Sequence, residues 1–190
     1  MRIIYGGSFN PPTIAHKRMY YFLDDKLSFD EFIYLPVSTK YSKANLESNE
    51  DRFNMLNLLI KDMPKAQVSR DEFNDLTYLG TYNYLKTQSK DTLFVMGSDN
   101  LKTISSWINC DKLLSEFKFI VIERDSDNSE DLIEKDVLLK KNKENFIIFN
   151  DFDMSVSSSD YRCNKNESII PNEVLEYIKT NHLYGGSNEK

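Results

Sequence analysis

Residues 2–16 read Arg2-Ile-Ile-Tyr5 and then Gly6-Gly-Ser-Phe-Asn-Pro-Pro-Thr-Ile-Ala-His16. The apolar run bounded by glycines predicts a short buried strand, and the residues from Lys17 to Leu27 are compatible with a helix. Glycines at such a strand-to-helix turn let the backbone approach a ligand, and free amides at the start of the helix attract anions. The stretch predicts an anion site with His16 beside it, although an ordinary turn with a solvated histidine is the alternative.

Six runs of apolar and aromatic residues recur along the chain, separated by stretches that are compatible with helices. This alternation predicts an α/β fold, a mostly parallel sheet flanked by helices. Ligands bind such open sheets beyond the carboxyl ends of the strands, where the glycine turn would lie. The expected strands are Arg2–Tyr5, Glu31–Leu35, Gln67–Ser69, Leu93–Met96, Phe117–Ile122 and Asn145–Phe149.

Three further segments are expected to be helical. Asn49 would cap one helix, with acidic residues in its first turn. A second would run from Thr77 to Leu85, and the charged segment Glu123–Glu144 predicts a solvated helix with polar flanks. The residues at helical spacing are Phe53, Leu56, Leu59 and Ile60 in the first helix and Tyr78, Thr81, Tyr82 and Leu85 in the second.

The bulk properties are those of a globular domain. A length of 190 residues fits one domain with a sizeable core. The net charge of −6, from 24 basic and 30 acidic side chains, gives no indication of a nucleic-acid or membrane partner. Cys110 and Cys163 show no paired spacing, the chain opens with no secretory leader, and no apolar stretch approaches the ~18 residues of a membrane span. We therefore expect a reduced, cytoplasmic protein.

Two features near the middle of the chain suit a nucleotide. Phe94-Val-Met-Gly-Ser-Asp-Asn100 repeats the opening arrangement, with Gly97 after a strand and the carboxylate of Asp99 placed to accept both hydroxyls of a ribose. Trp107, the sole tryptophan, offers a flat ring that could stack on a base. A plain helix cap at Asp99 and a packing role for Trp107 are the alternatives.

Basic groups occur in two other segments. The stretch Pro36–Leu46 carries Lys40 and Lys43 in a predicted loop. Val156-Ser-Ser-Ser-Asp-Tyr-Arg162 would start a helix with capping hydroxyls, free amides and a guanidinium, and so form a second anion site. Taken alone, either segment is equally typical of an exposed loop or an ordinary helix start.

Together these segments resemble the nucleotidylyltransferase superfamily. Residues 7–16 are similar to its pattern G-S/T-F-D/N-P-x-H/T-x-G-H, with Thr13 and Ala15 where many bacterial members have histidine and glycine. Residues 156–162 resemble its second signature, I-S-S-T-x-x-R, with Val156 and Ser159 as conservative replacements. The two signatures stand in the right order at opposite ends of the alternating pattern.

Other segments narrow the resemblance to the bacterial nicotinate mononucleotide adenylyltransferases. Residues 36–46 resemble the Pro-Val-x-x-x-Tyr-x-Lys-x-x-Leu loop of nicotinamide mononucleotide adenylyltransferases, which aligns Lys43 with a phosphate-contacting lysine and leaves Lys40 as a second candidate. Thr77 and Tyr78 match a helix start that lines the nucleobase pocket. Residues 171–184 resemble the closing helix, in which Val174, Tyr177 and Ile178 would pack, and His182 would be exposed.

The resemblance implies a Rossmann-like nucleotidyltransferase fold in a single domain, 1–190, in which a helical subregion, 154–185, completes the ATP site. It implies transfer of the adenylyl group of ATP to nicotinate mononucleotide, giving deamido-NAD and pyrophosphate in NAD synthesis. Mg²⁺ would enter with the ATP phosphates, with no metal site on the protein. The implied site residues are His16, Thr13, Lys43 and Arg162 as catalytic groups, Gly6, Gly7, Ser8, Phe9, Gly97, Asp99, Ser157, Ser158 and Ser159 for ATP, and Asn10, Thr77, Tyr78 and Trp107 for the mononucleotide.

Three alternatives stay open at this point. Nicotinamide mononucleotide could be the preferred acceptor, because backbone amides that would select a carboxylate are invisible in the side chains. Another adenylyltransferase of the same fold, such as phosphopantetheine adenylyltransferase, shares the threonine variant. A nucleotide sensor without turnover is the third, and the oligomeric state is not readable from the sequence.

Overall fold

The computed structural model describes residues 1–40, 46–73, 80–123, 128–152 and 156–185. Within these residues one six-stranded sheet has the order β3-β2-β1-β4-β5-β6, and every neighbouring pair is parallel. This is the 3-2-1-4-5-6 order of doubly wound sheets, which reverses between β1 and β4. The predicted fold class is confirmed, and each strand lies within two residues of its expected bounds. The strands are β1 (Arg2–Gly7), β2 (Glu31–Pro36), β3 (Ala66–Val68), β4 (Thr92–Gly97), β5 (Lys118–Ile122) and β6 (Phe146–Phe149).

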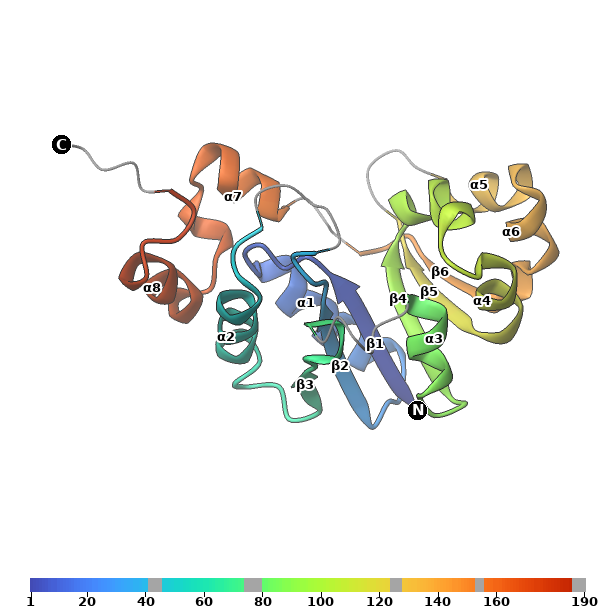
Figure 1. The fold of residues 1–190 in the computed structure, drawn as a ribbon, viewed down its shortest axis with the longest axis horizontal. Coiled ribbons are helices and arrows are strands. Elements are labelled where there is room, and N and C mark those ends of the chain that lie inside the picture. The colour runs from blue at the N-terminus through green and yellow to red at the C-terminus, as the bar shows by residue number, and fades with distance from the viewer. Residues whose placement is uncertain (41–45, 74–79, 124–127, 153–155, 186–190) are drawn as a thin grey trace.

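Helices cover both faces of the sheet (Figure 1). In the described residues these are α1 (Ile14–Lys26), α2 (Asn49–Leu59), α3 (Thr81–Lys86), α4 (Cys110–Glu116), α5 (Ser129–Lys135), α6 (Val137–Lys141), α7 (Ser158–Asn164) and α8 (Asn172–Thr180). Short 3₁₀ segments also occur in the described chain: η1 (Asp71–Phe73), η2 (Ser98–Lys102), η3 (Ile104–Ser106), η4 (Lys143–Asn145) and η5 (Glu167–Ile169).

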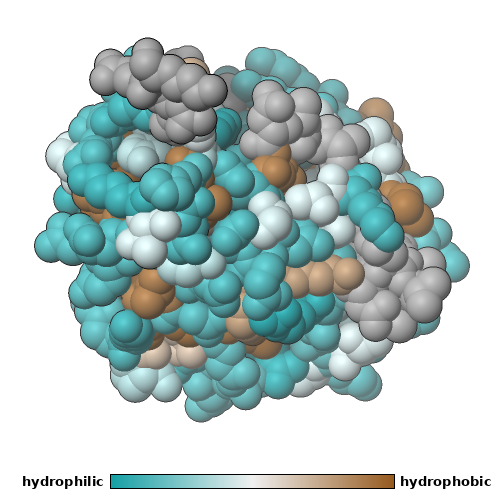
Figure 2. All heavy atoms as spheres, turned by 60° about the vertical axis from the view of Figure 1, so that its left-hand side comes forward, coloured by the Kyte–Doolittle hydropathy of each residue, from teal (hydrophilic) through white to brown (hydrophobic). Residues whose placement is uncertain are grey.

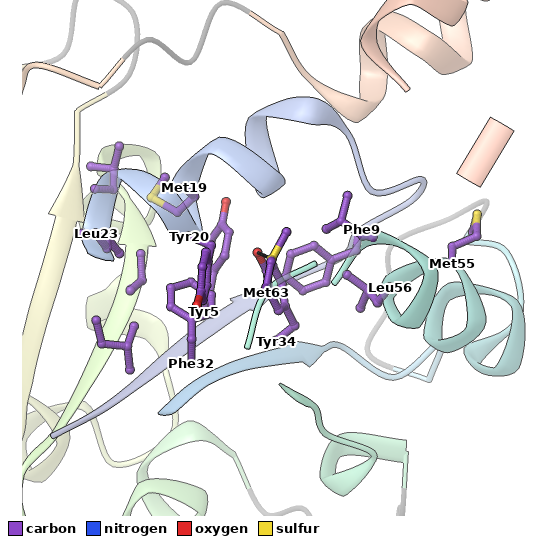
Figure 3. Packing of buried hydrophobic residues seen from close by; sticks show 14 of the residues in the cluster. Tyr5, Phe9, Met19, Tyr20, Leu23, Phe32, Tyr34, Met55, Leu56 and Met63 are labelled. Carbon is purple, nitrogen blue, oxygen red and sulfur yellow. Dashed lines mark hydrogen bonds between the residues drawn. The ribbon is translucent and has the colours of Figure 1, made fainter. Parts of the chain in front are cut away.

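The sheet separates two hydrophobic cores. Alternate residues of a strand point to opposite faces, so Ile3 and Tyr5 of β1 join the core under α1, α2 and α8, whereas Ile4 joins the core under α3 to α6. Burial on both faces is what the continuous apolar runs of a parallel sheet require. Figure 3 shows the first core, in which Phe32 and Tyr34 pack with ring centroids 5.0 Å apart. This aromatic layer supports the turn after β1.

The start of α2 differs from the prediction at its cap and on its buried face. Ser48 is the N-cap rather than Asn49, because the Ser48 hydroxyl accepts a 3.0 Å hydrogen bond from the Asp51 amide. The buried face consists of Arg52, Met55, Leu56 and Leu59, whereas Phe53 and Ile60 are half-buried. An arginine therefore occupies a position on the buried face of this helix.

The next two helices also differ from the predictions. The described part of the expected helix Thr77–Leu85 begins at Thr81, after Gly80, and buries Tyr82 and Leu85 as expected. The single solvated helix predicted over residues 123–144 was wrong. Two short helices occur there, because Asp136 accepts hydrogen bonds of 2.8 Å and 3.0 Å from the amides of residues 138 and 139 and so caps α6.

Helix α8, near the end of the chain, lies beside α2 (Figure 1). Val174 and Ile178 of α8 are buried, as predicted, and His182 beyond the helix is exposed. The Tyr177 hydroxyl donates a 3.0 Å hydrogen bond to the Asp51 carboxylate of α2. The last part of the chain is thus fixed against the element that follows β2.

The surface in Figure 2 is largely hydrophilic, and its hydrophobic side chains are scattered. Tyr21, Ile108 and Val137 are the exposed large hydrophobic residues of the described chain. None of the described helices combines the length and apolar character needed to cross a membrane.

Candidate active site

A cavity of about 860 Å³ lies where the strand order reverses, at the carboxyl ends of β1 and β4. Pockets for small molecules commonly measure ~300–1,000 Å³, so this cavity is near the upper end of that range. Turns far apart in the sequence converge on it. The predicted residues that line it are Gly6, Gly7, Ser8, Phe9, Asn10, His16, Gly97, Asp99, Trp107, Ser157, Ser158, Ser159 and Arg162.

We call one side of the cavity the turn wall; it consists of residues 6–10, His16, residues 157–159 and Arg162. Its two glycines are required by packing inside the protein. A Cβ on Gly6 would lie 2.8 Å from the Phe94 ring, and one on Gly7 would lie 3.0 Å from the Phe9 ring. The two glycines therefore let the backbone pack closely against aromatic rings of the protein. Their close approach to a ligand stays a prediction.

His16 is held by contacts that set its tautomer. The Thr13 amide donates a 2.9 Å hydrogen bond to Nδ1 of His16, so the proton of the neutral ring sits on Nε2. The rings of Tyr5 and Phe9 flank the imidazole at centroid distances of 6.0 Å and 5.0 Å. Tyr34 donates a 2.9 Å hydrogen bond to the His16 carbonyl. His16 is thus fixed in the first turn of α1, as predicted, and the proton of its neutral ring sits on Nε2.

Thr13 lies behind His16 rather than on the cavity surface. Its side chain is fully buried, and its hydroxyl is 2.9 Å from Nδ1 of His16. Thr13, expected among the catalytic groups, thus contacts the imidazole in this structure. Ala15 is buried in the same helical turn, so alanine in place of the usual glycine fits the regular backbone of α1.

The start of α7 is tied to the turn after β1. Ser158 donates a 2.7 Å hydrogen bond to the Pro11 carbonyl. Arg162 donates one of 2.6 Å to the Asn10 carbonyl and another of 3.0 Å to the Ser159 hydroxyl. These contacts bring the two predicted anion sites, about 150 residues apart, to one cavity.

Ser157 serves as the N-cap of α7. Its hydroxyl accepts a hydrogen bond from the Asp160 amide, and its own amide and hydroxyl each donate to the Asp160 carboxylate at 2.7 Å. These hydrogen bonds hold the pKa of Asp160 below its usual value. The cap leaves the first turn of α7 well defined beside the cavity.

Arg52 organises the turn wall, although we did not assign it to the site. Its fully buried guanidinium donates to the carbonyls of Ser8, Val37 and Glu47 at 2.9 Å, 2.6 Å and 3.1 Å. Burial lowers the pKa of this arginine. The sequence does indicate that Arg52 is buried, because residues 52, 55, 56 and 59 have the spacing of one helix face.

The other side, the ring wall, consists of Gly80, Gly97, Asp99, Asn100 and residues 106–108. The Trp107 ring packs edge-on against Phe94, with centroids 6.5 Å apart. Ile108, 61% exposed, stands at the same wall and also lies next to Gly80, whose φ is +92°. This wall offers flat and apolar surface.

The charged groups of the cavity are few in the described chain. Arg162 is the one lysine or arginine among the described residues that line it, and Asp99 and the buried Glu72 are the carboxylates. Lys40 is exposed and is not part of the wall. Lys43, Thr77 and Tyr78 lie outside the described residues. Within the described chain no three histidine, cysteine, aspartate or glutamate side chains are grouped as a metal site.

Relatives of the chain agree over nearly its whole length. A probable nicotinate-nucleotide adenylyltransferase of Acholeplasma laidlawii is 34% identical over 97% of both chains. One of Clostridium acetobutylicum is 31% identical over 96% of this chain and 98% of the relative. Both relatives have the same name, and this chain matches nearly the whole length of each.

Solved structures share the fold. The nicotinic acid mononucleotide adenylyltransferase of Plasmodium falciparum complexed with APC has a TM-score of 0.77 and 25% identity over 96% of both chains. The same protein complexed with NaAD has a TM-score of 0.76 and 26% identity. The family model described as cytidylyltransferase-like matches residues 4–164. The chain therefore belongs to the cytidylyltransferase-like family and, within it, to the nicotinate-nucleotide adenylyltransferases.

Proposed function

We propose that this enzyme transfers the adenylyl group of ATP to nicotinate mononucleotide, giving deamido-NAD and pyrophosphate. The observation that carries the proposal is the pair of hydrogen bonds from α7 to the turn after β1, which brings Arg162 and His16 to one cavity. The named relatives support the same reaction, because the chain matches them from end to end. A site that binds a nucleoside triphosphate next to a second phosphate needs several hydrogen-bond donors to stabilise the negative charge.

The reaction requires no protein nucleophile. An oxygen of the mononucleotide phosphate attacks the α-phosphorus of ATP, the new P–O bond forms, and the bond to the β-phosphate bridge breaks with its electron pair leaving on pyrophosphate. His16 would donate Nε2–H to a nonbridging oxygen of the α-phosphate as negative charge develops. Arg162, Ser158 and the amides near Gly7 and Ser8 would hold the triphosphate, with Lys43 as a further donor.

The remaining predicted residues divide between the two nucleotides. Asp99, after Gly97, would accept the hydroxyls of the adenosine ribose. Trp107 would stack on the pyridine, with Asn10, Thr77 and Tyr78 completing that subsite. We place the ATP subsite partly on the helical subregion 154–185 of a single domain, 1–190.

We propose that Mg²⁺ is carried in by the ATP phosphates. Asp99 and Glu72, the carboxylates of the cavity wall, come from different turns, and this donor set fits an outer-sphere role better than a cage. The metal would neutralise charge on the phosphates when it is bound. A cytoplasmic location is part of the proposal and is supported by the two free cysteines.

Pyrophosphate release with ATP and each candidate acceptor tests the function. We expect turnover with nicotinate mononucleotide, a smaller kcat/KM with nicotinamide mononucleotide, and none with 4′-phosphopantetheine. Chelation of divalent metal should abolish release, and added Mg²⁺ should restore it. Absence of pyrophosphate with both pyridine mononucleotides would refute the proposal, and tight ATP binding without product would favour a sensor.

A further inference from the structure

The end of the chain returns to the turn wall. Beyond α8, His182 and Tyr184 adopt φ values of +52° and +60°, left-handed conformations that redirect the backbone. The Tyr184 hydroxyl then donates a 3.0 Å hydrogen bond to Oδ1 of Asn10. Asn10 lines the cavity and is 1% exposed. A residue 174 positions away therefore contacts a side chain of the site.

Two donors converge on the Asn10 amide oxygen. Besides Tyr184, the Glu47 amide donates a 3.0 Å hydrogen bond to Oδ1. The Tyr184 amide in turn donates one of 2.7 Å to the Glu47 carboxylate, which closes a ring of three residues. Because Oδ1 faces these donors, the planar side-chain amide must direct its Nδ2 donors to the other side. The orientation of Asn10 is thus fixed by the C-terminal segment.

Tyr184 is itself held firmly. Lys165 donates a 2.6 Å hydrogen bond to its carbonyl, and its ring meets the Tyr161 ring edge-on at 5.8 Å. Burial raises the pKa of Tyr184 well above its usual value. The hydroxyl therefore remains a protonated donor throughout the neutral range.

We propose that Tyr184 is a positioning residue of the transfer reaction, acting through Asn10 by fixing the side-chain amide that faces the mononucleotide. This inference rests on the proposed function, because it assigns Asn10 to the acceptor subsite. The Tyr184 hydroxyl fixes the direction of the Asn10 side-chain donors. The Tyr184 ring holds the segment after α8 against Tyr161 of α7.

The substitution Tyr184→Phe tests the hydroxyl alone, because phenylalanine keeps the ring contact. Loss of one hydrogen bond should raise KM for nicotinate mononucleotide by about 3- to 10-fold while kcat and KM for ATP change by less than about twofold. Tyr177→Phe is the matched control: its hydroxyl bonds Asp51 and Asn54 of α2, and neither of these residues lines the cavity. Equal kinetics for the two variants would overturn the inference.

A double-mutant cycle and a spectrum show whether Asn10 is the intermediary. In an Asn10→Ala background, Tyr184→Phe should cause no further change in KM, and an undiminished effect would refute action through Asn10. In the ligand-free protein, Tyr184→Phe should shift the Asn10 side-chain amide resonances and Tyr177→Phe should not; unmoved resonances would also refute it. A wild-type enzyme without turnover would defeat the proposed function instead, so the two failures are distinguishable.

Discussion

The two walls of the cavity are built differently. At the turn wall, hydrogen bonds join residues far apart in the chain, as from Arg162 to Asn10 and from Arg52 to Ser8, separations of 152 and 44 positions. The ring wall includes residues of the short segments η2 and η3, where a hydrogen bond such as the one from Asn100 to the Gly97 carbonyl spans three positions. Hydrogen bonds between distant segments fix the positions of those segments relative to one another, whereas a bond within one turn fixes only that turn.

This difference matches the demands of the two subsites. Stabilising charge on phosphate requires donors in place before the reaction, since reorganising them would cost transition-state energy. Stacking on a flat ring tolerates small displacements, because dispersion and apolar burial are not strongly directional. We therefore expect changes at the turn wall to lower kcat or stability, and changes at the ring wall to raise KM.

The largest effect should come from His16→Ala at the turn wall. Removing one preorganised donor to a developing charge typically costs about 10²- to 10³-fold in kcat. His16→Ala should also lower the free energy of unfolding by about 1 kcal/mol, because the Thr13 amide loses its acceptor at the start of α1, so kcat is compared at a temperature at which both proteins are folded. His182→Ala is the control, since the chain has two histidines and His182 is exposed. Measured by pyrophosphate release, a His16 variant that keeps more than about a tenth of wild-type kcat would contradict the assigned role.

The next effect tests what holds the turn wall in place. Arg52→Met keeps much of the side-chain volume but leaves the carbonyls of Ser8, Val37 and Glu47 without this donor, which should cost about 3 kcal/mol of unfolding free energy. Arg70→Met is the matched control on the same side of the protein. Arg70 pairs with Glu50 at the surface, at 2.8 Å, so its loss should cost under about 1 kcal/mol. Urea unfolding that gives equal losses for both variants would contradict the comparison.

Much of the fold was predictable because it is encoded locally. Buried parallel strands require continuous apolar runs, and all six were found by this signal. The predicted family was confirmed because the turn after β1 and the start of α7 are short segments whose residue types are dictated by backbone and capping geometry. Even there, the cap of α2 shifted by one residue, since Ser48 and Asn49 are both good caps and the backbone decided between them.

The supports of the site could not be predicted, because they are long-range pairings. The sequence shows that Arg52 falls on an apolar helix face, but not that three carbonyls from separate segments meet it. Tyr184 ends the segment that resembles the closing helix and was assigned no role, because its contact with Asn10 depends on how the C-terminal helices dock. The roles of the site residues themselves remain predictions.

Trp107→Ala probes the ring wall and should have a smaller effect. Stacking of an aromatic side chain on a base is worth roughly 1–3 kcal/mol, so KM for nicotinate mononucleotide should rise by about tenfold. KM for ATP should change by less than about twofold, and Trp107→Phe should recover most of the loss. A parallel rise in both KM values would mean that Trp107 only supports the fold through its contact with Phe94, 6.5 Å between centroids.

The smallest effect separates two roles for Thr13. If its hydroxyl positions His16, Thr13→Val should lower kcat by about 3- to 10-fold, the value of one hydrogen bond, and leave KM for ATP unchanged. The Thr13 amide persists in the variant and still donates to Nδ1, so the Nε2–H tautomer survives and the loss stays modest. Thr13→Ser should restore kcat. A rise in KM for ATP with unchanged kcat would place the hydroxyl on the phosphate instead, and would mean that the turn wall rearranges when ATP binds.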